Sequence, residues 1–234
     1  MNSFLFMLAQ TQGDMPVLTG DTTEEAAQTG ISFFDLALKG GWIMIPIALL
    51  FIFALYIFFE RFLVIKQKSK VDPGFMNRIK DYISDNKIDS AINLCEQTKT
   101  PVARMIEKGI TRLGRPLEDV NAAIENVGNL EIAKMEKGLA FLATISGGAP
   151  MIGFLGTVIG MIRAFYDMAN AGNNIDVGLL SNGIYTAMVT TVAGLIVGII
   201  AYFAYNFLVA RVDKVVHKME SSTMEFLDLL NEPA

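Results

Sequence analysis

The sequence predicts an all-α membrane protein with three transmembrane helices, and three charge-free stretches are the main reason. In a chain of 234 residues, no Asp, Glu, Lys or Arg occurs within residues 40–59, 138–162 or 177–210. A helix of about 20 apolar residues crosses the roughly 30 Å hydrocarbon layer of a bilayer. Only 18% of all residues are charged, compared with about 25% in a typical soluble domain. The composition therefore favours a polytopic membrane protein over a soluble one.

The distribution of basic residues predicts the orientation of these helices. Of the 19 Lys and Arg residues, 14 lie between positions 61 and 137, and three lie from Arg211 to the end of the chain. Basic residues close to a span resist translocation across the membrane. We therefore expect residues 66–137 and the C-terminal segment in the cytoplasm, with the N-terminus and the loop after the second span on the periplasmic side.

These patterns divide the chain into eight segments. At the start, residues 3–9 are apolar but follow no basic residue, which favours an uncleaved tail over a signal peptide. The predicted segments are a flexible periplasmic tail (1–30), an interfacial amphipathic helix (31–41), a first transmembrane helix (42–65), a cytoplasmic helical domain (66–137), a second transmembrane helix (138–168), a periplasmic loop (169–178), a third transmembrane helix (179–208) and a cytoplasmic C-terminal helix (209–234).

The second and third spans are predicted to extend beyond the bilayer. The third stretch of 34 uncharged residues would be about 51 Å long as one helix, and the excess over the hydrocarbon layer must be shielded by other protein. We expect spans two and three to be elongated into a cytoplasmic helical bundle. We also expect one unbroken helix over residues 119–142, which would enter the second span without a stop.

Small residues distinguish the second and third spans from the bulky first span. Small residues let helix backbones approach closely, and such contacts drive helix association in a membrane. We expect spans two and three to pack against each other through these residues, and copies of the chain to pack in the same way in a ring. The predicted packing residues are Pro150, Gly153 and the GxxxG pairs Gly156–Gly160 and Gly194–Gly198.

The same two spans carry hydroxyl groups. A membrane Thr can bond a carbonyl of its own helix at little cost, but six hydroxyls in two helices favour a polar-lined interior. They belong to Thr144, Ser146, Thr157, Thr186, Thr190 and Thr191. Carboxylates, lysines and histidines do not occur deep in any span, although a proton path normally needs a group that loads and unloads. If protons cross, a partner must bring the Asp or Glu.

Charged and reactive residues elsewhere are predicted to be structural. Arg163 and Asp167 lie one turn apart near the outer end of span two, a spacing that favours an ion pair. This pair would act as a clamp or, alternatively, assist ion entry. Cys95 reads as a core residue and His217 lacks ligand-like neighbours. The sequence contains no catalytic motif, metal-ligand spacing or basic patch, so we predict no enzyme, metal, cofactor or nucleic acid.

Three ordered motifs resemble the MotA/TolQ/ExbB proton channel family, in its three-span ExbB and TolQ branch. They are Ala149-Pro150 followed by GFLGTVIGMIRAF (153–165), then GIYTAMVTTVAGLIVGI (183–199) with Tyr205-Asn206, and the cytoplasmic stretch DSAINLCEQTKTPVARMIEKG (89–109). The resemblance covers nearly everything between residues 32 and 207. Because the motifs are long and in the same order, it is specific.

The resemblance implies a ring, commonly a pentamer, around a single-span protein of the ExbD or TolR type that carries the membrane aspartate. It also implies a TonB- or TolA-type protein that transmits the motion across the periplasm. Thr157 and Thr191 match family positions that line the central pore. Family members typically have a Glu where this chain has Thr186. This departure leaves the partner as the source of the proton-carrying group and keeps Thr186 as a polar candidate on the same pathway.

The predicted function is therefore a ring subunit of a proton-driven motor in the bacterial inner membrane, of the ExbB–ExbD type, which energises TonB-dependent transport across the outer membrane. Three alternatives remain at this point: a TolQ-like subunit for envelope maintenance, a subunit of a surface-motility motor, and a membrane scaffold that conducts no ions. A self-sufficient channel is disfavoured because its own carboxylate is missing from the spans.

Overall fold

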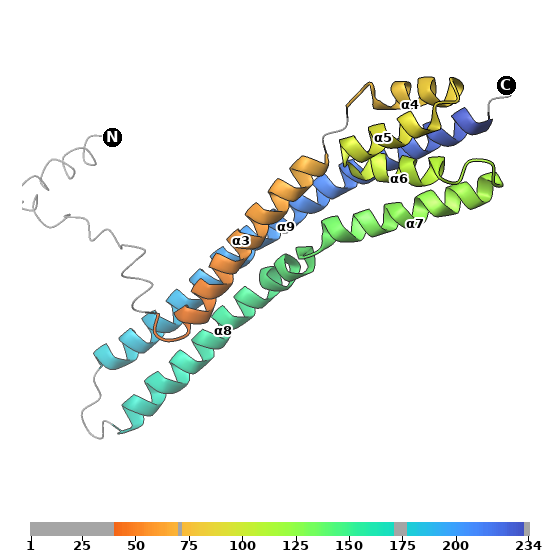
Figure 1. Cartoon of the computed structure of the whole chain (residues 1–234). Helices are drawn as coiled ribbons and strands as arrows, with labels where there is room; N and C mark the ends of the chain where they lie inside the picture. Colours follow the sequence, from red (N-terminus) through yellow and green to blue (C-terminus); the bar gives the residue numbers. More distant parts are fainter. Residues whose placement is uncertain (1–39, 70–71, 171–176, 232–234) are drawn as a thin grey trace, which may run out of the picture.

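The computed structural model describes residues 40–69, 72–170 and 177–231, and this part of the chain contains helices and no strands. The predicted tail (1–30) and most of the predicted interfacial helix (31–41) lie outside the described residues. The helices are α3 (Met44–Lys68), α4 (Phe75–Ser84), α5 (Ile88–Thr98), α6 (Pro101–Ile110), α7 (Leu117–Glu136), α8 (Leu139–Asn170) and α9 (Val177–Asn231). Figure 1 shows them as one elongated bundle.

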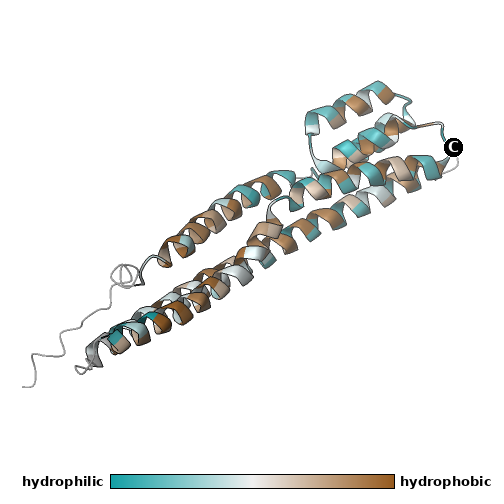
Figure 2. Cartoon of the chain, turned by 90° about the horizontal axis from the view of Figure 1, so that it is seen from below, coloured by the Kyte–Doolittle hydropathy of each residue, from teal (hydrophilic) through white to brown (hydrophobic). Residues whose placement is uncertain are grey.

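Three of the helices are long and apolar enough to cross a membrane, which confirms the predicted fold class of a polytopic all-α protein. In Figure 2 the hydrophobic residues dominate α3, α8 and the first half of α9, whereas hydrophilic residues cover the end that holds α4–α7. The exact segment boundaries given above remain predictions, because the structure contains no membrane.

The helices α8 and α9 form the backbone of the molecule. They lie antiparallel and side by side, and α3 packs along both of them (Figure 1). The 55 residues of α9 correspond to about 80 Å of helix, well over the bilayer thickness. This one helix includes both the predicted third span and the predicted C-terminal helix, without a break at residue 208.

The helices α4–α7 pack around the C-terminal half of α9 and form a core of the kind found in soluble proteins. Its largest fully buried side chains include Phe75, Ile106, Ile124 and Phe226. Local signals fix the start of α6, where Pro101 occupies the first turn and the Thr100 hydroxyl accepts a hydrogen bond from the Ala103 amide at 3.3 Å. This N-cap satisfies a backbone donor that would otherwise have no partner.

The expected unbroken helix over residues 119–142 is wrong. Helix α7 ends at Glu136, and α8 begins at Leu139 after a two-residue turn. Gly138 in this turn has a φ of +90°, which L side chains rarely adopt. The Arg61 guanidinium of α3 also donates to the Lys134 carbonyl at 3.4 Å, and this bond serves one of the free carbonyls at the end of α7. The glycine thus ends one helix and starts the next.

Candidate functional site

The contact between α8 and α9 is made by glycines. A methyl group added at Gly194 would lie 2.6 Å from the Ala149 carbonyl oxygen and 2.9 Å from the Gly153 Cα atom. One added at Gly160 would lie 2.8 Å from the Cβ atom of Ala187. These distances are too short for real carbon contacts, so the two backbones touch only because these side chains are absent. Gly153, Gly156, Gly194 and Gly198 all face the other helix in this way.

Pro150 contributes to the same contact. It lies inside α8 and has no amide proton, so the Ser146 carbonyl loses its usual partner in the helix. A Cβ atom added at Gly198 would lie 2.9 Å from that carbonyl oxygen and 2.5 Å from the Pro150 ring. The bulk of the proline ring is thus accommodated by a glycine of the opposite helix.

Thr157 and Thr191 lie at the same level of this helix pair. The Thr157 hydroxyl donates to the Phe154 carbonyl at 2.6 Å, and the Thr191 hydroxyl donates to the Gly153 carbonyl at 3.1 Å. Both hydroxyls are therefore held by consecutive carbonyls of α8, although they come from different helices. Both side chains are half-buried in a single copy of the chain.

These two threonines face away from α3. Helix α3 contacts α8 at Phe141, with Phe53 at 6.2 Å between ring centroids, and contacts α9 at Phe207, with Phe58 at the same distance. Thr157 lies 16 residues after Phe141 on α8, and Thr191 lies 16 residues before Phe207 on α9. At about 100° per residue, each threonine points about 160° away from the phenylalanine on its own helix. We call the side of the α8–α9 pair that carries Thr157 and Thr191 the threonine face.

Thr186 does not lie on the threonine face with Thr157 and Thr191. It is 21 residues from Phe207, about 60° apart on the wheel of α9, and so points toward the side covered by α3. Its place on a proton pathway stays a prediction. Thr190, which was not among the predicted pathway residues, is the most buried hydroxyl of the pair, with 1% of its surface exposed. It donates to the Ala187 carbonyl at 2.7 Å and lies 3.4 Å from the Gly153 carbonyl oxygen.

Arg163 and Asp167 are exposed near the outer end of α8. The salt bridges formed within the described ranges do not include one between them, so the predicted ion pair stays a prediction. Both residues lie closer to the C-terminal end of α8 than Thr157 does. The threonine face itself is uncharged, because α8 has no charged residue before Arg163 and α9 has none before Arg211.

A buried charge cluster lies in the α4–α7 end instead. The Glu131 side chain, which is 2% exposed, accepts hydrogen bonds from Arg104 and Lys134 at 2.7 Å and from Lys68 at 3.0 Å. Burial alone would raise the pKa of this carboxyl group. The bonds from Lys134, Lys68 and Arg104 outweigh that effect and lower the pKa to about 2. We call these four residues the Glu131 cluster.

The Glu131 cluster joins the end of α3 to α6 and α7, and our sequence reasoning missed it. A signal was present. Val120, Ile124, Gly128, Glu131 and Met135 follow one another at spacings of three or four and are all buried on one side of α7. A carboxylate in the middle of such a stripe must be paired, because an isolated buried charge is too costly.

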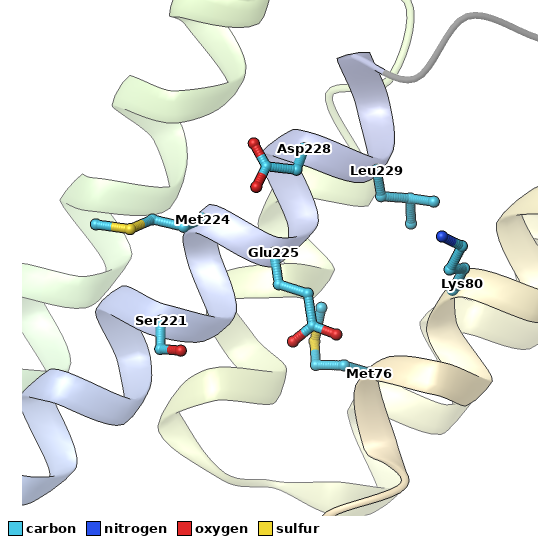
Figure 3. A pocket seen from close by; sticks show the side chains of 7 residues that line it. All are labelled: Met76, Lys80, Ser221, Met224, Glu225, Asp228 and Leu229. Atoms are coloured by element: carbon cyan, nitrogen blue, oxygen red, sulfur yellow. The ribbon is translucent and has the colours of Figure 1, made fainter.

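Other reactive groups are inert in this setting. Cys95 is buried, and burial raises the pKa of its thiol to about 12, which agrees with a core role. His217 is exposed beside Glu220 at 3.2 Å. Figure 3 shows a hollow between α4 and α9 with a mixed lining, in which Lys80, Ser221, Glu225 and Asp228 alternate with Met76, Met224 and Leu229. Among the residues that the structure describes, no group of three His, Cys, Asp or Glu side chains is placed to hold a metal ion.

Comparison with known proteins gives a consistent result. Residues 97–221 match the MotA/TolQ/ExbB proton channel family. An ExbB homolog of Methanothermobacter thermautotrophicus, named as a biopolymer transport protein, is 31% identical over 81% of this chain and 69% of its own length. An ExbB-like protein of Synechocystis is 31% identical over 75% of this chain and 70% of its own length. The Tol-Pal system protein TolQ of Haemophilus influenzae is 34% identical over 45% of this chain and 46% of its own length.

The three apolar helices and these relatives agree on a membrane location. The matched region begins at the end of α5 and continues through α6, α7, α8 and most of α9, so it contains the threonine face and three members of the Glu131 cluster, and Lys68 of α3 lies before it. This chain belongs to the MotA/TolQ/ExbB proton channel family.

Proposed function

We propose that this chain is the ring-forming subunit of a motor driven by the proton-motive force, of the ExbB–ExbD type, and that the motor energises TonB-dependent transport across the outer membrane. The observation that carries this proposal is the threonine face, where two hydroxyls from two helices are held on consecutive carbonyls of α8. A face that offers hydroxyls and no charge suits a guest helix that brings its own carboxylate.

The chemistry of the hydroxyls supports this role. Each threonine donates its proton to a backbone carbonyl and keeps lone pairs that accept a hydrogen bond. A protonated carboxylic acid on the partner helix can donate to these oxygens, whereas an ionised carboxylate needs donors instead. Thr157 and Thr191 therefore stabilise the protonated partner during its passage through the membrane. In this proposal the partner is a single-span protein of the ExbD or TolR type with a membrane Asp.

A closed ring of copies would turn the threonine face into a tunnel wall. We propose five copies, as in the family pattern given above. In a single copy, large apolar side chains of α8 such as Met151 and Phe154 remain 74% and 66% exposed. Neighbouring copies and the lipid bilayer would cover these surfaces.

The proposed location is the bacterial inner membrane, with the N-terminus in the periplasm and the C-terminus in the cytoplasm. The 14 basic residues between positions 61 and 137 support this orientation. A TonB- or TolA-type protein would receive the motion on the periplasmic side. In this role the chain is a non-enzymatic transport subunit that needs neither a cofactor nor nucleic acid.

A TolQ-like role in envelope maintenance is the second candidate, because a TolQ protein is among the relatives at 34% identity. Both roles use the same ring and the same partner chemistry. They differ in the protein that receives the force, so they predict the same behaviour of the threonine face. Deleting the chain and scoring envelope leakage against energised uptake separates the two roles.

The proposal is tested with Thr157→Val and Thr191→Val, each of which removes one hydroxyl at nearly constant volume. We expect energised uptake to fall at least about tenfold, which corresponds to the loss of one hydrogen bond to a charged or protonated group. Ring assembly, measured by size-exclusion chromatography of the solubilised complex, should stay normal. The matched control is Thr144→Val, because Thr144 bonds the Ala140 carbonyl of its own helix and points toward the α3 side.

Normal uptake in both threonine variants would contradict a polar pathway. The scaffold alternative is tested on the partner, by replacing its membrane carboxylate with the amide. A motor should lose all activity in that variant, whereas a scaffold that conducts no ions should keep it.

A further inference from the structure

An apolar groove lies between α3 and α9, on the opposite side of the molecule from the threonine face. Its volume is about 460 Å³, and its walls include Phe58 and Phe59 of α3 with Ala204 and Phe207 of α9. The groove runs along two parallel helices (Figure 1). Its lining is hydrocarbon and its wall runs from Ile200 to Phe207 along α9, about 10 Å, which fits a segment of a flexible apolar chain and not a compact polar ligand.

Two cations lie just beyond the end of the groove that is nearer to the α4–α7 bundle. The Arg211 guanidinium carbon lies 5.0 Å from the centroid of the Phe207 ring, and the Lys66 ammonium lies 6.0 Å from that of Phe62. Neither cation takes part in a salt bridge within the described part of the chain. Aromatic faces stabilise a cation only partly, so both charges can still bind an anion.

We propose that this groove holds an acyl chain of an anionic phospholipid, whose phosphate is bound by Lys66 and Arg211. The dimensions agree. From Ile200 in the groove wall to Arg211 is about 16 Å along α9, close to half of the roughly 30 Å hydrocarbon layer. A lipid with its phosphate at the two cations therefore has its acyl chain at the level of the groove.

Charge distinguishes a lipid from a second copy of the chain as the occupant. At the same end of another copy, Arg61 is paired with Glu60 at 2.7 Å and Lys68 with Glu131 at 3.0 Å, which leaves Lys66, Arg211 and Lys214 against Asp213. A neighbouring copy placed in the groove would bring mostly like charges to Lys66 and Arg211. A phosphate brings the opposite charge, and basic residues near a membrane surface attract anionic lipids for this reason.

The cation part is tested with the double variant Lys66→Gln and Arg211→Gln. The full-length protein is reconstituted in an equimolar mixture of phosphatidylglycerol and phosphatidylethanolamine, and the retained lipid is measured by native mass spectrometry. We expect the native protein to retain phosphatidylglycerol in preference. In the double variant, the preference for phosphatidylglycerol should fall about 30-fold. This change corresponds to about 2 kcal/mol for the two cations. The matched control is Lys108→Gln on α6, which removes a cation far from the groove.

The groove part is tested with Ala204→Phe, which fills the space with a ring. This variant should retain less lipid of either headgroup while its ring still elutes at the native size. An unchanged lipid ratio in the double variant would overturn the proposal, and so would dissociation of the ring by Ala204→Phe with the lipid content unchanged, because a second copy would then occupy the groove. Only the leaflet in which this lipid would lie depends on the membrane orientation proposed above for the chain. Since the readout is bound lipid, it is independent of whether the chain conducts protons.

Discussion

The two ends of this molecule are held together by different chemistry, although α9 runs through both. In the membrane half, α8 and α9 touch through glycine backbones, and every charged group is excluded from the contact. In the other half, α9 packs into a core of large side chains beside a buried carboxylate with three basic partners. Water makes hydrophobic side chains pack in the second half, whereas close backbone contact must hold helices together in lipid.

The difference teaches where each half is vulnerable. The membrane contact is vulnerable to added atoms, because the neighbours of Gly153 and Gly194 are backbone atoms that cannot move aside. The Glu131 cluster is vulnerable to loss of its carboxylate, because Glu131 is buried and supplies the one negative charge to which Lys68, Arg104 and Lys134 donate. The following three changes separate these two kinds of dependence, in order of the expected effect on stability.

The largest effect is expected from Glu131→Gln. This change removes a charge whose pKa is about 2 in the folded protein, against an ordinary value of 4.5. The difference corresponds to a loss of stability on the order of 3 kcal/mol at neutral pH. Thermal unfolding of the solubilised protein, followed by circular dichroism, measures this loss. The matched control is Glu136→Gln, an exposed carboxylate on the next turn of α7, which should change stability by less than about 0.5 kcal/mol.

The same cluster predicts a pH dependence with a definite sign. A carboxyl group whose pKa is lowered by folding stabilises the protein above its unfolded pKa, and the stabilisation is lost as the pH falls toward its folded pKa. The contribution of Glu131 should therefore be complete above about pH 5 and disappear between about pH 4.5 and pH 2. Glu131→Gln should flatten the stability curve across that window. Equal slopes in the two proteins would show that Glu131 does not cause the dependence.

The second effect is expected from Gly194→Ala. The added methyl group would lie 2.6 Å from a backbone carbonyl oxygen of α8, so the two helices must separate, at a cost of about 2 kcal/mol. The yield of assembled ring from membranes should fall accordingly. The matched change, Gly147→Ala, adds the same atom where nothing lies within 4 Å and should leave the yield intact. If both variants assembled equally well, close contact through Gly194 would not be the basis of the α8–α9 pairing.

The smallest effect is expected from Gly138→Ala at the turn between α7 and α8. The methyl group has room, since the nearest side-chain atom is 3.5 Å away, but the φ of +90° disfavours any residue with a Cβ atom. We expect a cost of about 1 kcal/mol, measured in the same unfolding assay. An increase in stability would instead mean that α7 and α8 straighten into one helix.

Much of this architecture could be predicted from the sequence, because charge-free length and glycine spacing are strong local signals. The uncharged run from residue 177 to 210 and the GxxxG pairs predicted long paired helices, and α8 and α9 have that form. The break at Gly138 was not predicted, because a glycine within a helical pattern does not reveal the sign of its φ. That sign depends on how α3 packs against the turn, through contacts far apart in the sequence.

The functional surfaces were predicted only in part for a similar reason. Spacing along one helix cannot show which threonines share a side of two packed helices, so Thr186 was grouped with Thr157 and Thr191. Only the position of α3 separates them. Likewise, Glu131 meets Lys68 and Arg104 across three helices, and the buried stripe on α7 indicates that Glu131 needs a partner but not which residues of other helices supply it.

The uninterrupted course of α9 has a mechanical consequence. From Thr191 to its end at Asn231, α9 is about 60 Å long without a break, so a tilt of about 5° near Thr191 would displace that end by roughly 5 Å. Phe226, which is buried near that far end, would carry α4–α6 along with it. In the proposed ring, a tilt of α9 at the level of Thr191 would therefore also move the α4–α6 end of each copy, without a separate signal.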